Sequence, residues 1–310
     1  MKKFLKYCLF FVLPLLIAAI PVEYMIRQVP NPYKYKYEWM QKNAEDVEIL
    51  VFGSSHAMYG IRPEFLEGKA FNLAFESQVI AYDYFLLKHF SDKYKNLKTV
   101  ILPISYFTLF FRFEDLSSWW KCRYHHIYMN CDYHPYSIKY NYELSHLPSA
   151  IGKFKSFIKK QIKNEQSNLV DLYGWGNTYL FQKRDTLNIS DTKRALSTIN
   201  WQTSNDWSHI DEIISSVDDV VTFCKSRHID LILVTLPAWP TYYNNLDPKQ
   251  YKKMTQLIDS ICQKHHLPYL NYLKDSRFTF DDFFDNSHLN DIGATKFTKI
   301  LDKDIRSIKR

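Results

Sequence analysis

The stretch Val47-Glu-Ile-Leu-Val-Phe-Gly-Ser-Ser55 decides the fold class. Its first six residues form a short apolar run, and Gly53-Ser54-Ser55 follows as a tight turn. An apolar run of this length, bounded by turn residues, is typical of a strand buried on both faces. Helical segments alternate with such runs farther along the chain. The strands are therefore predicted to lie parallel, covered by helices.

Four more apolar runs and several amphipathic stretches support this prediction. The predicted strands after the first are residues 70–74, 99–102, 231–236 and 269–273. The predicted helices are residues 77–93, 210–224, 251–261 and the end of the chain from about residue 292. The sequence thus predicts an α/β fold, a three-layer and mostly parallel sheet with helices on both faces.

The N-terminus predicts a membrane location. Residues 7–22 carry no charge, and Lys2, Lys3 and Lys6 precede them. Residues 1–27 are therefore predicted to be an uncleaved membrane anchor, with the lysines in the cytoplasm and the rest on the extracytoplasmic side. A cleaved signal peptide is the alternative. Residues 28–45 are interpreted as a linker and residues 46–310 as the domain.

Residues about 107–205 interrupt the strand–helix rhythm and are rich in aromatic residues. This segment is predicted to be an insertion or lid over the carboxyl edge of the sheet, where open α/β folds bind ligands. Within it, apolar residues share one helical face of 151–162, and lysines crowd the remainder. Binding to anionic lipid and packing against the domain both remain open for this helix.

Composition and cysteine spacing indicate which partners and cofactors to expect. The net charge of +7 with 24% charged residues is ordinary for a globular protein, and no basic stripe accompanies a nucleic-acid motif, so nucleic acid is not an expected partner. The five cysteines have no metal-ligand spacing, and neither metal nor cofactor is expected. Cys122 and Cys131 form a disulfide or remain two free thiols.

Two segments carry the chemistry. Ser55 follows the first strand at a strand-to-helix turn, which presents a serine hydroxyl at the sheet edge. Asp285 precedes His288 by three residues in the loop before the last helix. This spacing lets the carboxylate hold Nδ1–H of the imidazole and leaves Nε2 free to take a proton from a serine. Ser55, Asp285 and His288 are therefore the predicted catalytic triad.

Together these two segments resemble SGNH (GDSL-like) hydrolases, over residues 45–105 and 210–310. The resemblance implies that Ser55 is the nucleophile, with Ser54 in place of the usual Asp. It also implies that the backbone N–H groups of Ser55 and Ser77 receive the oxyanion, although Ser77 stands where the family has Gly. The family's Asn after the third strand is missing here, and Ser105 is a candidate substitute. No role follows for His56 beyond structure.

Within that family, the sequence most resembles the membrane-anchored SGNH proteins of bacterial surface-polymer acylation, such as those of polysaccharide O-acetylation and teichoic acid D-alanylation. It implies an extracytoplasmic serine acyl-ester hydrolase or O-acyltransferase that acts on a cell-surface or exported polysaccharide. A membrane-embedded O-acyltransferase is the implied partner. The alternative is a non-catalytic SGNH scaffold that binds glycan or such a partner.

Overall fold

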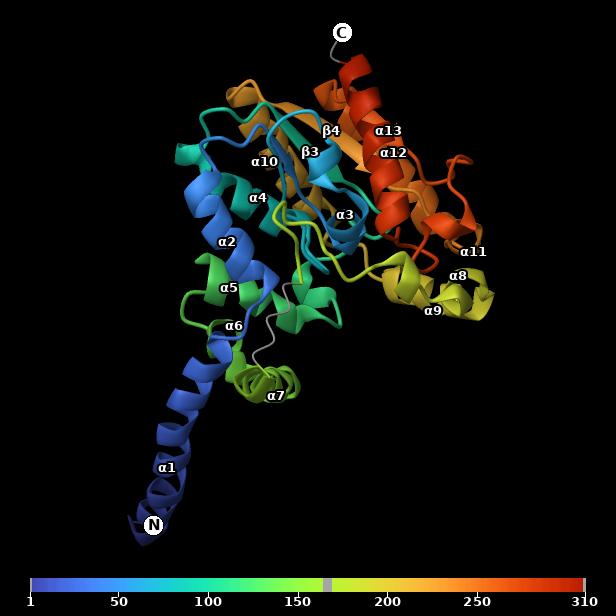
Figure 1. Cartoon of the computed structure of the whole chain (residues 1–310). Helices are drawn as coiled ribbons and strands as arrows, with labels where there is room; N and C mark the ends of the chain where they lie inside the picture. Colours follow the sequence, from blue (N-terminus) through green and yellow to red (C-terminus); the bar gives the residue numbers. More distant parts are fainter. Residues whose placement is uncertain (1, 164–168, 309–310) are drawn as a thin grey trace. The chain divides into compact units, whose positions relative to one another are not determined.

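A computed structural model describes residues 2–163 and 169–308 of the chain, which forms two compact units (Figure 1). The first unit combines Met1–Tyr37 with Trp120–Asn168. The second combines Glu38–Trp119 with Leu169–Arg310. The residues predicted as one insertion are thus divided between the units. Each unit is described by itself below.

The second unit is built on a five-stranded sheet in which every pair of neighbouring strands is parallel. The strand order is β2-β1-β3-β4-β5, the flavodoxin-like order of doubly wound folds. The strands are β1 (Ile49–Val51), β2 (Ala70–Asn72), β3 (Thr99–Pro103), β4 (Asp230–Thr235) and β5 (Tyr269–Asn271). The predicted α/β class is confirmed.

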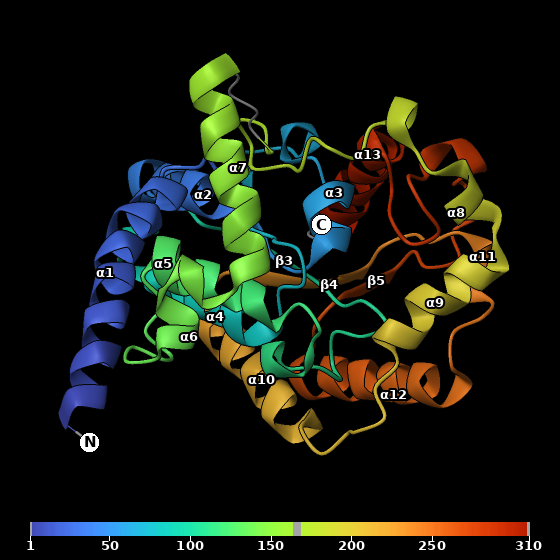
Figure 2. The ribbon, with the colours of Figure 1, turned by 90° about the horizontal axis from the view of Figure 1, so that it is seen from below.

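Helices cover both faces of this sheet (Figure 2). The figure shows α10 (Ile210–Ser226) and α12 (Pro248–His265) on one side, and α3 (Ser55–Gly60) and α13 (Asp291–Ile308) on the other. Helix α4 (Ile80–His89) packs on α10. Because both faces are covered, β1 and β3 are buried at every residue, which explains their continuous apolar sequences.

The second unit also holds short helices. They are η1 (Pro63–Phe65), η2 (Ser91–Lys93), η3 (Phe113–Asp115), η6 (Phe181–Lys183), α8 (Thr186–Ser190), α9 (Thr192–Gln202), α11 (Pro240–Tyr243) and η7 (Phe280–Asp282).

The regular elements of the first unit are all helices within its described residues. This unit contains α1 (Lys2–Arg27), α5 (Arg123–Met129), α6 (Ile138–Asn141), η5 (Glu143–Ser145) and α7 (Leu147–Lys163), while η4 (Trp119–Cys122) begins at its edge. Cys122 and Cys131 are both buried free thiols, so the structure has no disulfide between them. Burial raises the pKa of the Cys131 thiol to about 12.

Residues expected only as a linker form helix α2 (Pro32–Asn43), within which the two units meet in the sequence. Asn31 Oδ1 accepts the N–H of Lys34, and Pro32 is the first helical residue. Both are ordinary signals of a helix start. Met40 on this helix is fully buried. The alternation of tyrosine and lysine concealed the helix because neither its polar nor its apolar residues follow a clear helical period.

Candidate active site

The strand order indicates where on the sheet a ligand site is expected. The chain leaves β1 toward β2 on one side, whereas β3 lies on the other, so the carboxyl ends of β1 and β3 flank the point where the order reverses. Open α/β sheets bind ligands at such switch points. Ser55 follows β1 and Ser105 follows β3, so both serines lie at this edge.

The turn before Ser55 depends on Gly53. Its φ of +105° lies in the region that favours glycine, and an added Cβ would come within 3.2 Å of the Pro103 ring. The Gly53 N–H donates to Asp83 Oδ1 at 2.9 Å. Asp83 lies on α4 and is buried. The carboxyl therefore fixes the backbone two residues before the predicted nucleophile.

The loop that carries Asp285 and His288 is held against the start of α13. Asn290 Oδ1 accepts the N–H groups of Ile292 and Gly293 and so caps the helix. Gly293 approaches Asp282 so closely that an added Cβ would lie 2.0 Å from its carbonyl oxygen. Only glycine fits there, because the neighbouring atom is backbone. Asn290 and Gly293 thus hold the loop that carries Asp285 and His288 in place.

The three predicted triad residues come together. Ser55 Oγ lies 2.9 Å from His288 Nε2. His288 Nδ1 lies 3.0 Å from both carboxylate oxygens of Asp285. When Asp285 accepts the Nδ1–H, Nε2 is left to accept the hydroxyl proton of Ser55, which is the arrangement that activates a serine.

Asp285 is also held as an ionised acceptor. Its Oδ1 accepts the backbone N–H groups of Ser287 and His288, each at 2.9 Å. Burial acts to raise the pKa of Asp285, but the charge and hydrogen bond of His288 and these two N–H groups bring the pKa below its usual value. The carboxylate can therefore orient the imidazole and stabilise the imidazolium.

The two predicted oxyanion donors have backbone N–H groups with no acceptor among residues 2–163 and 169–308. Ser55 is the first residue of α3. Ser77 has φ +61°, the left-handed region that favours glycine. Phe75 N–H donates to Gly53 O at 3.1 Å, so the segment runs beside the nucleophile turn.

Ser105, which follows β3, and His56 form a pair. Ser105 Oγ lies 2.9 Å from His56 Nδ1, and both residues are buried. The His56 ring stands nearly perpendicular to that of His288, with centroids 4.8 Å apart. Burial, helped by the charge of His288, lowers the pKa of His56 to about 3. The imidazole is therefore neutral, and its buried Nε2 has no partner in the described part of the chain.

Two features of the site were not anticipated from the sequence. Asp83 is one, because a single acid in an apolar helix carries no motif. The other is an aromatic wall of stacked rings, Tyr59, Tyr179 and Phe284, with centroids 3.7 and 4.0 Å apart. Tyr179 also meets the His288 ring edge to face at 5.2 Å. It comes from the predicted insertion, where no pattern indicated a site residue.

Part of the predicted insertion thus belongs to the active-site region. Asp185 N–H donates to Phe284 O, and Asn286 Nδ2 donates to Asn188 Oδ1 at 2.6 Å. These bonds join residues 185–188 to the loop of the predicted base.

No protein-family model matches the chain, and no curated protein matches it in sequence. Among solved structures, the chain is similar to a "putative acylhydrolase" from Bacteroides fragilis NCTC 9343. The two are 11% identical with a TM-score of 0.39, over 88% of this chain and 96% of that one. A likeness of this size carries no argument about the activity.

Proposed function

We propose that the chain is a serine esterase or O-acyltransferase that works through an acyl-serine intermediate. One observation carries the proposal: the hydrogen-bonded series Ser55–His288–Asp285, with separations of 2.9 and 3.0 Å. The Oγ of Ser55 attacks an ester carbonyl while His288 takes its proton, and His288 then protonates the leaving alcohol. Water or a sugar hydroxyl next attacks the acyl-serine while His288 takes its proton, and His288 returns that proton to Ser55 Oγ as the bond between Oγ and the acyl group breaks.

The neutral His56 supports this mechanism. A second cation beside His288 would oppose formation of the imidazolium, and burial keeps His56 uncharged at neutral pH. The N–H groups of Ser55 and Ser77 are the proposed oxyanion donors, because neither has another acceptor in the described residues.

The proposed location is the membrane, with the second unit on the extracytoplasmic side. Within the described residues, one helix is long and apolar enough to cross a bilayer, with mean hydropathy 1.8 over Phe10–Arg27 and 6% of that window buried. The lysines before it favour a cytoplasmic N-terminus. An acylated surface or exported polysaccharide is the proposed substrate, and a membrane-embedded O-acyltransferase is the proposed partner. Both follow from the resemblance.

The first test is fluorophosphonate labelling of the full chain in detergent, together with release of acetate from p-nitrophenyl acetate. Ser55→Ala should abolish labelling and lower kcat by up to about 10⁶, the loss on removing a triad serine. Ser54→Ala is the matched control, because Ser54 is the adjacent buried serine and its side chain makes no capping bond. It should keep both activities.

Labelling that persists in Ser55→Ala would overturn the mechanism. Equal background rates in all three proteins, with no label on Ser55, would instead favour the non-catalytic scaffold. That alternative has one observation in its favour, the missing Asn after β3.

A further inference from the structure

Helix α7 has an apolar stripe that its own unit leaves uncovered. Leu147, Ile151, Phe154 and Ile158 recur at spacings of four, three and four residues, and so share one side of the helix. Their side chains are 61, 54, 37 and 43% exposed. We call these four residues the outer stripe. Such a contiguous exposed patch marks a surface that meets a protein or a membrane.

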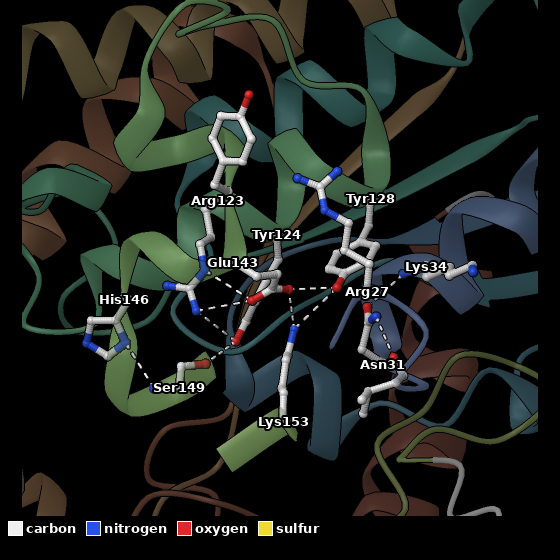
Figure 3. A network of polar contacts seen from close by, with 12 residues as sticks. Arg27, Asn31, Lys34, Arg123, Tyr124, Tyr128, Glu143, His146, Ser149 and Lys153 are labelled. Atoms are coloured by element: carbon white, nitrogen blue, oxygen red, sulfur yellow. Dashed lines mark hydrogen bonds and ion pairs between the residues drawn. The ribbon is translucent and has the colours of Figure 1, made fainter. Parts of the chain in front are cut away.

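The rotation of α7 is fixed by its other side. Ala150 is buried there, and Lys153 pairs with the fully buried Glu143, which Arg123 also contacts at 3.3 Å (Figure 3). Tyr128 donates to the same carboxylate at 2.6 Å. Turning the helix to bury the outer stripe would break this network and leave buried charges uncompensated. The exposure of the stripe is therefore built into the unit.

The segment just before α7 is bonded to the end of the apolar helix α1. Glu23 of α1 accepts the backbone N–H groups of Glu143 and Leu144 at 2.9 and 3.0 Å. Arg27 donates to Asn141 O at 2.8 Å. In Figure 1, α7 is seen nearly end-on and α1 is not, so the two helices are inclined to each other. A helix that begins at the end of a membrane span and is inclined to it lies beside the bilayer surface.

The charge of α7 fits an anionic surface. Lys155 and Lys159 are exposed, the sequence adds Lys160 and Lys163, and residues 147–163 contain no Asp or Glu. Apolar side chains on one side with lysines beside them are the features of helices that rest in the headgroup region of anionic bilayers.

We propose that α7 is an interfacial helix: the outer stripe enters the boundary between headgroups and acyl chains, and the lysines contact anionic headgroups. This inference rests on the proposed membrane anchor α1. It adds a second membrane contact, which sets how the first unit is oriented on the bilayer.

The test places an environment-sensitive NBD label on single introduced cysteines of the full chain, with one chain per lipid nanodisc. Ile151→Cys and Ile158→Cys probe the outer stripe. Ser156→Cys is the matched control, because Ser156 is exposed on the opposite side of the same helix. The unsubstituted chain, treated with the same reagent, gives the background from its own cysteines. Nitroxide-labelled lipid is the quencher.

In discs with anionic lipid, labels at 151 and 158 should be quenched at least about twofold more strongly than the label at 156, as expected for a stripe that enters the acyl region. Lys155→Glu combined with Lys159→Glu should reduce this difference. Equal quenching at all three positions would overturn the proposal.

Other outcomes distinguish a failure of the interfacial helix from a failure of the proposed anchor or of the proposed chemistry. A shielded stripe that lipid does not quench would mean that a protein covers it instead. A chain that fails to enter discs would refute the anchor, and with it the interfacial helix. Fluorophosphonate labelling of Ser55, measured on the same sample, reports the proposed chemistry independently.

Discussion

At the scale of single residues, the backbone of the candidate site depends on side chains that take no part in the proposed chemistry. Asp83 holds Gly53, and Ser77 takes a conformation that glycine adopts with less strain. Each makes a prediction that is independent of any substrate.

Ser77→Gly should raise the free energy of unfolding by about 0.5–1 kcal/mol, because it relieves the strain of a φ of +61°. The backbone N–H remains, so Ser55-dependent hydrolysis should persist. Urea unfolding measures the first effect. Ser77→Val is the comparison and should be less stable than either protein, since a β-branched residue tolerates this conformation poorly. A glycine variant no more stable than the parent would contradict the argument.

Asp83 predicts an unusual dependence of stability on pH. Burial raises its pKa to about 7, although the N–H of Gly53 and the amide of Gln78 act in the opposite direction. Between about pH 4 and 7 the folded chain therefore binds the proton more tightly than the unfolded chain does. This contribution to the free energy of unfolding falls as pH rises through that window, by at most about 1.4 kcal/mol per pH unit.

Asp83→Asn should remove this dependence on pH, because an amide does not titrate. The amide oxygen can still accept the hydrogen bonds from Gly53 and Gln78, so the local structure should be kept. Denaturant midpoints of parent and variant, measured from pH 4 to 8, give the difference directly. The variant should gain on the parent as pH rises. Parallel curves would show that Asp83 does not titrate in this range.

The triad could be predicted from the sequence, whereas its supports could not. Ser55 follows a recognisable strand, and Asp285 and His288 lie three residues apart, so local spacing carries the information. Asp83 and Tyr179 reach the site only through tertiary packing, and neither stands in a motif. The position of His56 beside His288 likewise depends on how two distant segments meet.

At the scale of elements, central strands and amphipathic helices were predictable. Burial on both faces gives a strand a continuous apolar run, and burial on one face gives a helix its apolar period. Helix α2 was not, although Asn31 and Pro32 mark its start. The role of α7 was also undecided, because residues such as Ala150 and Lys153 pack inward while the outer stripe faces outward. Because α7 has apolar residues on two faces, its sequence alone does not show which face packs against the rest of the unit.

Glu143→Gln should loosen the packing of α7, because it leaves Arg123 and Lys153 without their buried counter-charge. Such a loss costs about 3–5 kcal/mol, or at least about a hundredfold in the opening equilibrium. Maleimide labelling of the buried Cys122 and Cys131 measures that opening, and Cys224 in the second unit serves as internal reference. Glu45→Gln, which removes an exposed partner of Lys95, should change nothing measurable.

At the scale of the whole molecule, α1 is part of the first unit as well as the proposed anchor. Glu23 and Ile26 are buried in that unit. A chain that lacks residues 1–27 should therefore expose Cys122 and Cys131 to maleimide, whereas a chain that begins at residue 21 should keep both protected. Equal protection would show that the end of α1 is dispensable. The triad residues all belong to the second unit, so both truncated chains should keep Ser55 reactive.

The bonds from Glu23 to Glu143 and Leu144 also have a consequence for biosynthesis. The ribosome delivers Glu23 first, and its main partner follows 120 residues later. During that interval the carboxylate lacks the two backbone N–H groups that donate to it in the folded unit. Meanwhile residues 38–119 emerge with β1, β2 and β3 of a sheet that β4 and β5 complete. All residues of the first unit are translated before His288 of the second. Translation thus interleaves the assembly of the two units, and a pause before residue 143 would leave both unfinished together.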